Sequence, residues 1–254
     1  MRHCLFLSAV LAPLVVQAAD GLQLSSGLDY SSGSYGGAST TEISTAFVMG
    51  RYTAGPLSFK LTLPYLELKG PAIAMGGGDA MVIAPGSAAT LRGRVAGQGD
   101  VVASLGYEAW HDPEKDLALD VAARIKFPTA DASKGLGTGE RDLALQLNAY
   151  KGWGRATLLL GMGYRWMGKP EGSSYRDVLS ASAGLAYGLD ELTSVGGIVD
   201  WRQSVLASLA DQRELTLYVS HKLSRQWSLQ AYVYAGATDA SPDAGGGASL
   251  GYRF

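Results

Sequence analysis

The sequence predicts an all-β fold: a twelve-stranded antiparallel up-and-down β-barrel that spans a membrane and is preceded by a cleaved signal peptide. Three observations predict it. Apolar and polar residues alternate with a period of two along twelve segments. The links between these segments alternate between short and long. Finally, the first eighteen residues have the composition of an export signal.

The composition excludes several other classes of protein. Charged residues make up 17% of the 254 residues, below the roughly 25% of soluble domains. The net charge of −2 argues against a nucleic-acid binder. The single cysteine, Cys4, excludes a disulfide framework, and the chain has neither a His/Cys cluster nor an acidic loop with calcium spacing. We therefore expect no metal and no cofactor.

Residues 1–18 predict a Sec-type signal peptide. Arg2 supplies the positive charge, residues 5–16 form the apolar stretch, and residues 16–18 form a small-residue cleavage site. About a dozen apolar residues are too few to cross a hydrocarbon layer roughly 30 Å thick. We expect residues 19–254 to form the exported barrel.

The segment 117–127 shows the strand alternation most clearly. Leu119 and Val121 share one face, whereas Asp120 and Arg124 share the other. The twelve predicted strands are 22–30, 42–52, 57–67, 100–110, 117–127, 142–150, 155–166, 177–187, 193–202, 214–223, 227–235 and 247–254.

Every second link between these strands is short, and the others are long and rich in small polar residues. Short periplasmic turns, long outer loops and an even strand count are typical of bacterial outer-membrane barrels. We therefore predict a location in the bacterial outer membrane, in contact with lipid and lipopolysaccharide. The short links are 53–56, 111–116, 151–154, 188–191 and 223–226; the long ones are 31–41, 69–99, 128–141, 167–176, 203–212 and 236–246.

The aromatic residues indicate which face of the barrel is apolar. A soluble barrel would turn its apolar face inward, with large rings near the strand centres. In this sequence the rings lie near strand ends, as in the two aromatic girdles of a membrane barrel. The predicted periplasmic girdle contains Tyr107, Tyr187, Trp227, Tyr252 and Phe254; the outer girdle contains Phe127, Tyr164, Trp166 and Trp201.

The chain ends on an alternating strand with Leu250, Tyr252 and Phe254 on one face. A terminal aromatic residue resembles the signal that the outer-membrane barrel insertion machinery recognises. We therefore expect this machinery to be a partner that binds the Phe254 strand.

A search for catalytic residues gives no convergent set. His111 falls in a short link, where a solvated turn residue is expected, and His221 falls on the apolar face as a girdle residue. Ser220 points to the face opposite His221. We predict that the protein is not an enzyme. A lipid-modifying or proteolytic barrel enzyme is the alternative, because outer-membrane phospholipases also have twelve strands.

The polar face should line the lumen, and its charges nearly balance, so a strongly selective ring of one sign is not expected. Hairpin geometry predicts Arg124 and Lys126 beside Asp142, and Arg202 beside Glu214. We favour cross-strand ion pairs that fix the register over a polar ladder that guides a solute. Other inward charges are Lys60, Arg253, Glu42 and Glu108. The candidate pore-lining residues are Asp120, Arg124, Lys126, Asp142, Gln146, Asn148, Arg165, Asp200, Arg202, Glu214, Tyr218, Lys222, Tyr232 and Tyr234.

The link 69–99 is longer than an ordinary loop. It holds two apolar patches, 72–75 and 80–84, on either side of a triple glycine. We expect either an outer hairpin or a lumen constriction that favours apolar solutes. Three glycine-rich stretches predict flexible loop or a mobile loop tip: 76–78, 245–247 and 135–139.

Four stretches resemble the outer-membrane family named for the phenol meta-cleavage pathway. They are GQGDVVASLGY at 97–107, KFPTADASKGLGTGERD at 126–142, GYRWMG at 163–168 and the terminal LGYRF. The second is the most specific, since it joins a strand end, an outer loop and the next strand start. The resemblance covers the chain from about residue 95 and implies uptake of hydrophobic, often aromatic, small molecules; it implies no binding residues.

Together these observations predict a passive outer-membrane channel for small, hydrophobic or aromatic solutes. Two alternatives stay open: the barrel enzyme, and a structural barrel whose lumen is plugged by side chains.

Overall fold

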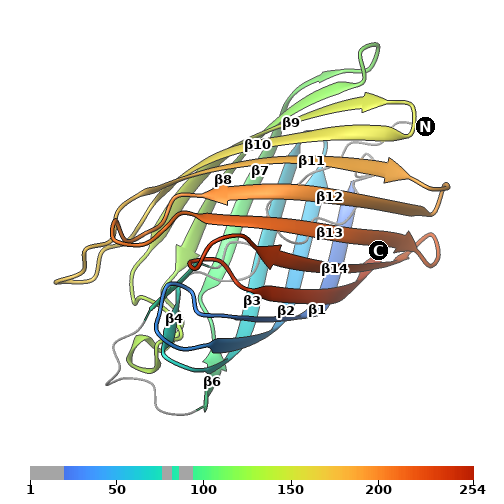
Figure 1. Cartoon of the computed structure of the whole chain (residues 1–254). Coiled ribbons are helices and arrows are strands. Elements are labelled where there is room, and N and C mark those ends of the chain that lie inside the picture. Colours follow the sequence, from blue (N-terminus) through green and yellow to red (C-terminus); the bar gives the residue numbers. More distant parts are fainter. Residues whose placement is uncertain (1–19, 76–81, 86–93) are drawn as a thin grey trace.

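The computed structural model describes residues 20–75, 82–85 and 94–254; the predicted signal peptide and the glycines at 76–78 lie outside these ranges. One antiparallel sheet closes on itself to form the wall (Figure 1). β1 (Gly21–Gly33) pairs with both β2 (Thr41–Ala54) and β15 (Ala244–Arg253), so the first and last strands meet. The predicted barrel fold is confirmed.

Each wall strand pairs antiparallel with its neighbours in sequence, and all twelve predicted strands are confirmed, with bounds that differ by a few residues. The other wall strands are β3 (Leu57–Lys69), β7 (Val101–Asp112), β8 (Leu117–Phe127), β9 (Asp142–Trp153), β10 (Ala156–Trp166), β11 (Val178–Gly188), β12 (Thr193–Arg202), β13 (Gln212–Lys222) and β14 (Trp227–Gly236).

β6 (Arg94–Gln98) and β7 share one position in the wall, because both pair with β3. The break between them stands opposite Pro64, which has no N–H to donate to a neighbouring strand. The carbonyl of Pro64 accepts the Gly99 N–H at 2.9 Å. The break turns the side chain of Asp100 into the barrel, where it is fully buried.

A second irregularity lies near the other end of β7, where its register against β8 shifts between Glu108 and Trp110. The extra residue places Trp110 on the outer face, 45% exposed. His111 lies on the inner side, with Nδ1 3.3 Å from Glu108 Oε2. The prediction of a solvated turn at His111 is wrong, because the bulge extends the strand and reverses its alternation.

The short turns gather at one end of the barrel together with the C-terminus, and the long connections lie at the other (Figure 1). We call these the periplasmic end and the outer end. Within the link 69–99, β4 (Ala72–Met75) and β5 (Val82–Pro85) form a separate antiparallel pair near the outer end. No helix in the described ranges is long and apolar enough to cross a membrane.

The outer face of the wall is apolar all the way round. Leucine and valine side chains on this face stay exposed, 67% for Leu28 and 53% for Leu217. Such a surface far exceeds the apolar patches of soluble monomers, so it belongs in lipid. Aromatic side chains border this belt as predicted. The exposed ones include Tyr107, Tyr187, Trp227 and Phe254 at the periplasmic end, and Tyr164 and Trp166 at the outer end.

Glu42 lies on the outer face, not the inner one. It alternates with the buried residues Thr41 and Ile43 of β2 and forms an exposed ion pair with Lys69 of β3, at 3.1 Å. The inward assignment was wrong because β2 carries threonine, isoleucine and phenylalanine on its inner face, so polarity does not mark the lumen side of this strand.

Candidate functional site: the lumen and its outer mouth

The candidate pore-lining residues all lie on the inner face of their strands. Burial alternates along each strand, and these residues fall on the side away from the exposed leucines. β8, β9 and β10 contribute Asp120, Arg124, Lys126, Asp142, Gln146, Asn148 and Arg165. β12, β13 and β14 contribute Asp200, Arg202, Glu214, Tyr218, Lys222, Tyr232 and Tyr234. That a solute passes beside them stays a prediction.

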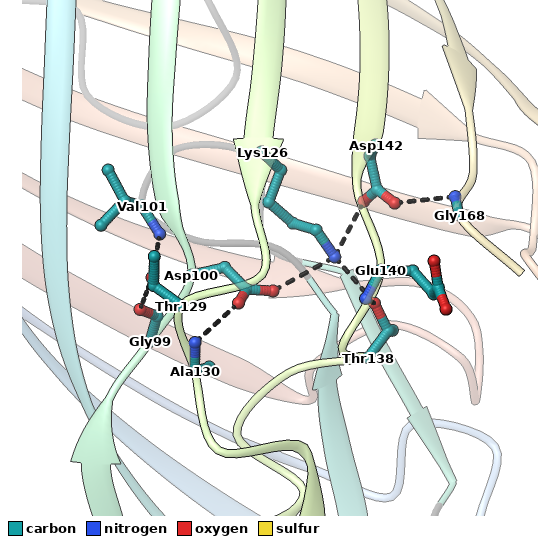
Figure 2. Close-up of polar contacts among 10 residues, drawn as sticks. All are labelled: Gly99, Asp100, Val101, Lys126, Thr129, Ala130, Thr138, Glu140, Asp142 and Gly168. Atoms are coloured by element: carbon teal, nitrogen blue, oxygen red, sulfur yellow. Dashed lines mark hydrogen bonds and ion pairs between the residues drawn. The ribbon is translucent and has the colours of Figure 1, made fainter. Parts of the chain in front are cut away.

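Lys126 forms a buried ionic cluster near the outer end of the barrel (Figure 2). Its Nζ lies 3.1 Å from Asp100 Oδ2 and 3.3 Å from Asp142 Oδ2, and it donates to Thr138 Oγ1 at 2.9 Å. All three charged side chains are at most 4% exposed. The predicted pairing of Lys126 with Asp142 is confirmed, whereas Asp100 was missed.

The same cluster ties two outer loops to the wall. Asp100 Oδ1 accepts the N–H of Ala130 at 3.0 Å, and Asp142 Oδ1 accepts the N–H of Gly168 at 3.0 Å (Figure 2). Thr129 adds a link, because its Oγ1 accepts the Val101 N–H and donates to the Gly99 carbonyl. Contacts between the stretches 97–107 and 126–142 therefore fix the position of the outer loop that follows β8.

The GLGTG stretch is folded into the barrel mouth rather than forming a mobile tip. Leu136 is 1% exposed and packs in a buried group that we call the mouth cluster. A Cβ added at Gly137 would stand 2.9 Å from the Asp100 carboxylate, so glycine is required for this approach. The mouth cluster consists of Tyr35, Ile43, Leu66, Leu68, Ala74 and Leu136.

β4 reaches both sides of the mouth. Ala74 is buried in the mouth cluster, and its N–H donates to the Gly135 carbonyl at 3.0 Å. The preceding residue, Ile73, packs against a second buried group, the rim cluster of Met167, Val178 and Val205. Adjacent side chains of one short strand thus contact two separate apolar clusters.

An acidic and aromatic group lies on β1 and β14. Asp29 Oδ2 accepts the Tyr232 hydroxyl at 2.7 Å, and its Oδ1 accepts the Tyr234 hydroxyl at 3.1 Å. The two rings stack at 6.1 Å. Sequence reasoning missed Asp29, although its position between Leu28 and Tyr30 marks it as inward-facing.

The glycines at 245–247 belong to β15, so the flexible-loop prediction for them is wrong. A Cβ added at Gly245 would lie 2.3 Å from Tyr234 Cζ, and one at Gly247 would lie 2.3 Å from the Tyr232 hydroxyl. Glycine is needed here because the tyrosine rings lie flat across the neighbouring strand.

Three arginines, which we call the arginine row, lie on alternate strands of one wall: Arg124, Arg165 and Arg202. With Asp200 they line a cavity of about 50 Å³. Arg124 on β8 and Arg165 on β10 both pair in register with Ala144, which lies on β9 between them. Within the described ranges, Arg124 forms no ion pair with Asp142. The other polar side chains that line this cavity are Gln146, Ser180 and Ser182.

Arg202 donates to Gln212 Oε1 at 3.1 Å. Glu214 pairs in register with Asp200 and lies two residues after Gln212, on the same inner face of β13. The predicted pair of Lys126 and Asp142 forms as expected. Arg202 donates to the amide of Gln212 and also attracts the Glu214 carboxylate electrostatically.

The candidate catalytic residues His221 and Ser220 lie on opposite faces of β13. His221 lies on the outer side of β13, with Nδ1 3.0 Å from Thr193 Oγ1, whereas Ser220 faces the lumen. The girdle position predicted for His221 is confirmed. Within the described ranges, no group of three or more His, Cys, Asp or Glu side chains could hold a metal ion.

Comparison with solved structures shows the same barrel fold. An outer membrane channel from Pseudomonas putida F1 has a TM-score of 0.72 at 15% identity, covering 93% of this chain and 97% of that one. The KdgM porin gives 0.54 at 8% identity, covering 91% and 99%. CymD, a monoaromatic hydrocarbon channel, gives 0.53 at 9% identity, covering 94% and 90%. At such identities the likeness establishes the fold.

No curated protein matches the sequence significantly. A family model described as "Putative MetA-pathway of phenol degradation" matches residues 19–254, which is nearly the whole chain. Because the match covers nearly the whole chain, the chain belongs to this family.

Proposed function

We propose that this protein is a passive channel of the bacterial outer membrane for small solutes. The closed barrel with an apolar outer belt and a charged inner face carries the proposal. Closure satisfies the backbone hydrogen bonds in lipid, and the polar inner face offers a hydrated path. Diffusion down a concentration gradient would need no cofactor.

The solutes we propose are small aromatic molecules. The family description and the hydrocarbon channel among the similar structures support this class. The partly exposed apolar side chains that pack on these two clusters, among them Val95, Ile73 and Tyr175, also support it, because they lie at the outer end where solutes enter. We propose that β4, whose Ala74 and Ile73 contact the two clusters, narrows the entrance.

Planar-bilayer recording tests the channel function. Purified protein should give discrete conductance steps, and removal of residues 72–75 should enlarge them because the entrance widens. Folded protein without conductance steps would contradict the proposal and favour a plugged structural barrel. Unchanged steps after the deletion would refute the constriction alone.

The proposal includes export by the signal peptide and insertion by the machinery that recognises terminal aromatic strands. Phe254 is 67% exposed and packs edge-to-face against Tyr252 with ring centres 4.9 Å apart. An enzymatic role has no supporting geometry in the described ranges, since His221 points toward lipid. Phospholipid turnover that disappears in a His221→Ala variant would overturn this conclusion.

A further inference from the structure

We propose that the arginine row of Arg124, Arg165 and Arg202 is a binding site for the carboxylate of a small organic acid on its way through the lumen. The inference rests on the proposed channel function and narrows its solutes to molecules that carry an anionic carboxylate. Benzoate, an aromatic ring with one carboxylate, is the probe that we use to test it.

The decisive observation concerns the guanidinium of Arg124. Its Nε and Nη2 atoms are buried and have no hydrogen-bond partner within the described ranges. These are the two nitrogens whose N–H bonds point the same way along one edge of the guanidinium group. A carboxylate accepts hydrogen bonds from this edge with both oxygens at once. Buried N–H groups without a hydrogen-bond acceptor cost free energy, so binding of a carboxylate at this edge of Arg124 is favourable.

The wall around Arg124 leaves room for a ligand. Neighbouring strands lie about 4.8 Å apart, so arginines on alternate strands are separated by roughly 10 Å at the backbone. The intervening inner positions carry small side chains, Ala144 on β9 and Ser180 on β11. Gly161 and Gly163 on β10 line the same cavity. The gap between the guanidinium groups therefore stays open.

The charge at this cavity favours an anion. Three guanidinium groups face it, and Asp200 is the carboxylate among its lining residues. The nearby Lys126 does not change this balance, since it is held between Asp100 and Asp142. The charges of the lumen nearly balance as a whole, but at this cavity three guanidinium groups gather with the single carboxylate of Asp200.

The site should discriminate by shape as well as by charge. A chloride ion offers the two parallel N–H bonds a single shared acceptor, whereas a carboxylate offers each of them its own oxygen. A neutral alcohol accepts a hydrogen bond without the assistance of charge. Gln146, Ser180 and Ser182 can add neutral hydrogen bonds to a bound carboxylate. We therefore expect retention in the order carboxylate, then chloride, then neutral aromatic.

The first test measures block of the channel by benzoate. Single-channel current is recorded in potassium chloride with increasing benzoate, or with benzyl alcohol as the neutral analogue. Benzoate should reduce the current in a saturable way, whereas benzyl alcohol at the same concentration should not. Arg124→Gln should raise the half-blocking benzoate concentration about tenfold or more, as expected for losing a charge-assisted pair of hydrogen bonds.

Two further variants separate the effect of the guanidinium geometry on benzoate block from the effect of positive charge alone. Arg124→Lys keeps the charge but lacks the two-pronged edge, so the block should stay weak. Arg253→Gln removes an inward arginine at the periplasmic end and should leave the block unchanged. Folding of each variant is checked by its resistance to denaturation in an unheated gel sample.

Calorimetric titration of benzoate into the folded protein in detergent provides a readout independent of conductance. Binding that vanishes in Arg124→Gln supports the site even if the bilayers are silent, in which case only the channel proposal fails. Equal benzoate affinity in wild type and Arg124→Gln overturns the inference. Equal block by benzoate and benzyl alcohol overturns it too, and leaves the channel proposal standing.

Discussion

Lys126 is a single buried lysine that joins two strand ends and two outer loops. It forms ion pairs with both Asp100 and Asp142, whose other carboxylate oxygens accept the backbone N–H groups of Ala130 and Gly168. Removing one partner of a buried ionic cluster leaves uncompensated charge in a poorly solvated place. The residue therefore matters for loop position and barrel stability together.

We predict that Lys126→Met lowers the free energy of unfolding by about 3–5 kcal/mol, because two buried aspartates lose their counter-charge. Denaturant titration of detergent-solubilised protein, followed by tryptophan fluorescence, measures this. The control is Lys134→Met, which removes the exposed pair with Asp131, 57% and 42% exposed, and should cost less than about 1 kcal/mol. Equal losses in the two variants would show that the cluster is not stabilising.

Strand β15 depends on its glycines to accept the tyrosines of β14. We predict that Gly247→Ala destabilises the barrel by about 1–3 kcal/mol, because the new methyl group would overlap the Tyr232 hydroxyl. Gly50→Ala is the matched control, since its Cβ would meet Leu24 Cδ2 at an ordinary 3.5 Å. The midpoint of thermal unfolding compares the two, and a loss in Gly50→Ala alone would contradict this account.

The outer loop between β10 and β11 should loosen in acid. The Met167 N–H donates to Asp177 at 3.1 Å and lowers the pKa of that carboxyl below its ordinary 3.8, with help from Lys169. Because the folded pKa is depressed, the stabilisation is complete above the ordinary pKa and is lost as the pH falls through the lower value. We expect the Met167 amide to exchange faster there.

Hydrogen exchange of the Met167 amide from pH 6 down to about pH 2.5 measures this effect against Asp177→Asn at each pH. The variant should exchange faster at neutral pH, and the difference should shrink as acid protonates Asp177 in the wild type. A difference that persists unchanged at the lowest pH would refute the role of the charge.

The strands were predictable because period-two alternation is a local property that survives in each segment separately. The irregularities were not, since the bulge at Ala109 and the break before Asp100 each reverse the alternation and show only in the pairing with the neighbouring strand. The glycine content of 245–247 and 135–139 led to the wrong prediction of flexible or mobile loop at both places. In both places glycine serves close packing, which depends on side chains that lie elsewhere in the sequence.

The site was predictable to the same depth. The parity of the strands placed the candidate lining residues on the inner face, and hairpin geometry paired Lys126 with Asp142. Loop side chains such as Tyr35 and Leu136 could not be placed, because a lone apolar residue in a polar loop gives no signal for what it packs against.

For the whole molecule, we predict that Phe254 matters through assembly more than through packing. Phe254 is highly exposed, so its loss should change the unfolding free energy of the finished barrel little. We predict that Phe254→Ser nevertheless lowers the amount of barrel in outer membranes, because the insertion machinery loses its contact. Quantifying the folded form in membrane fractions, against Trp153→Ser as an exposed aromatic control, tests this prediction; equal reduction in both would contradict it.

The seam between β1 and β15 has a further consequence for biogenesis. The wall is completed by pairing between two strands far apart in the sequence, so the ring cannot close before β15 has been synthesised. A chain that lacks β15 has two edge strands with unpaired backbone N–H and C=O groups, and such edges favour aggregation. Each copy therefore depends on protection of these edges until β15 is available to pair with β1.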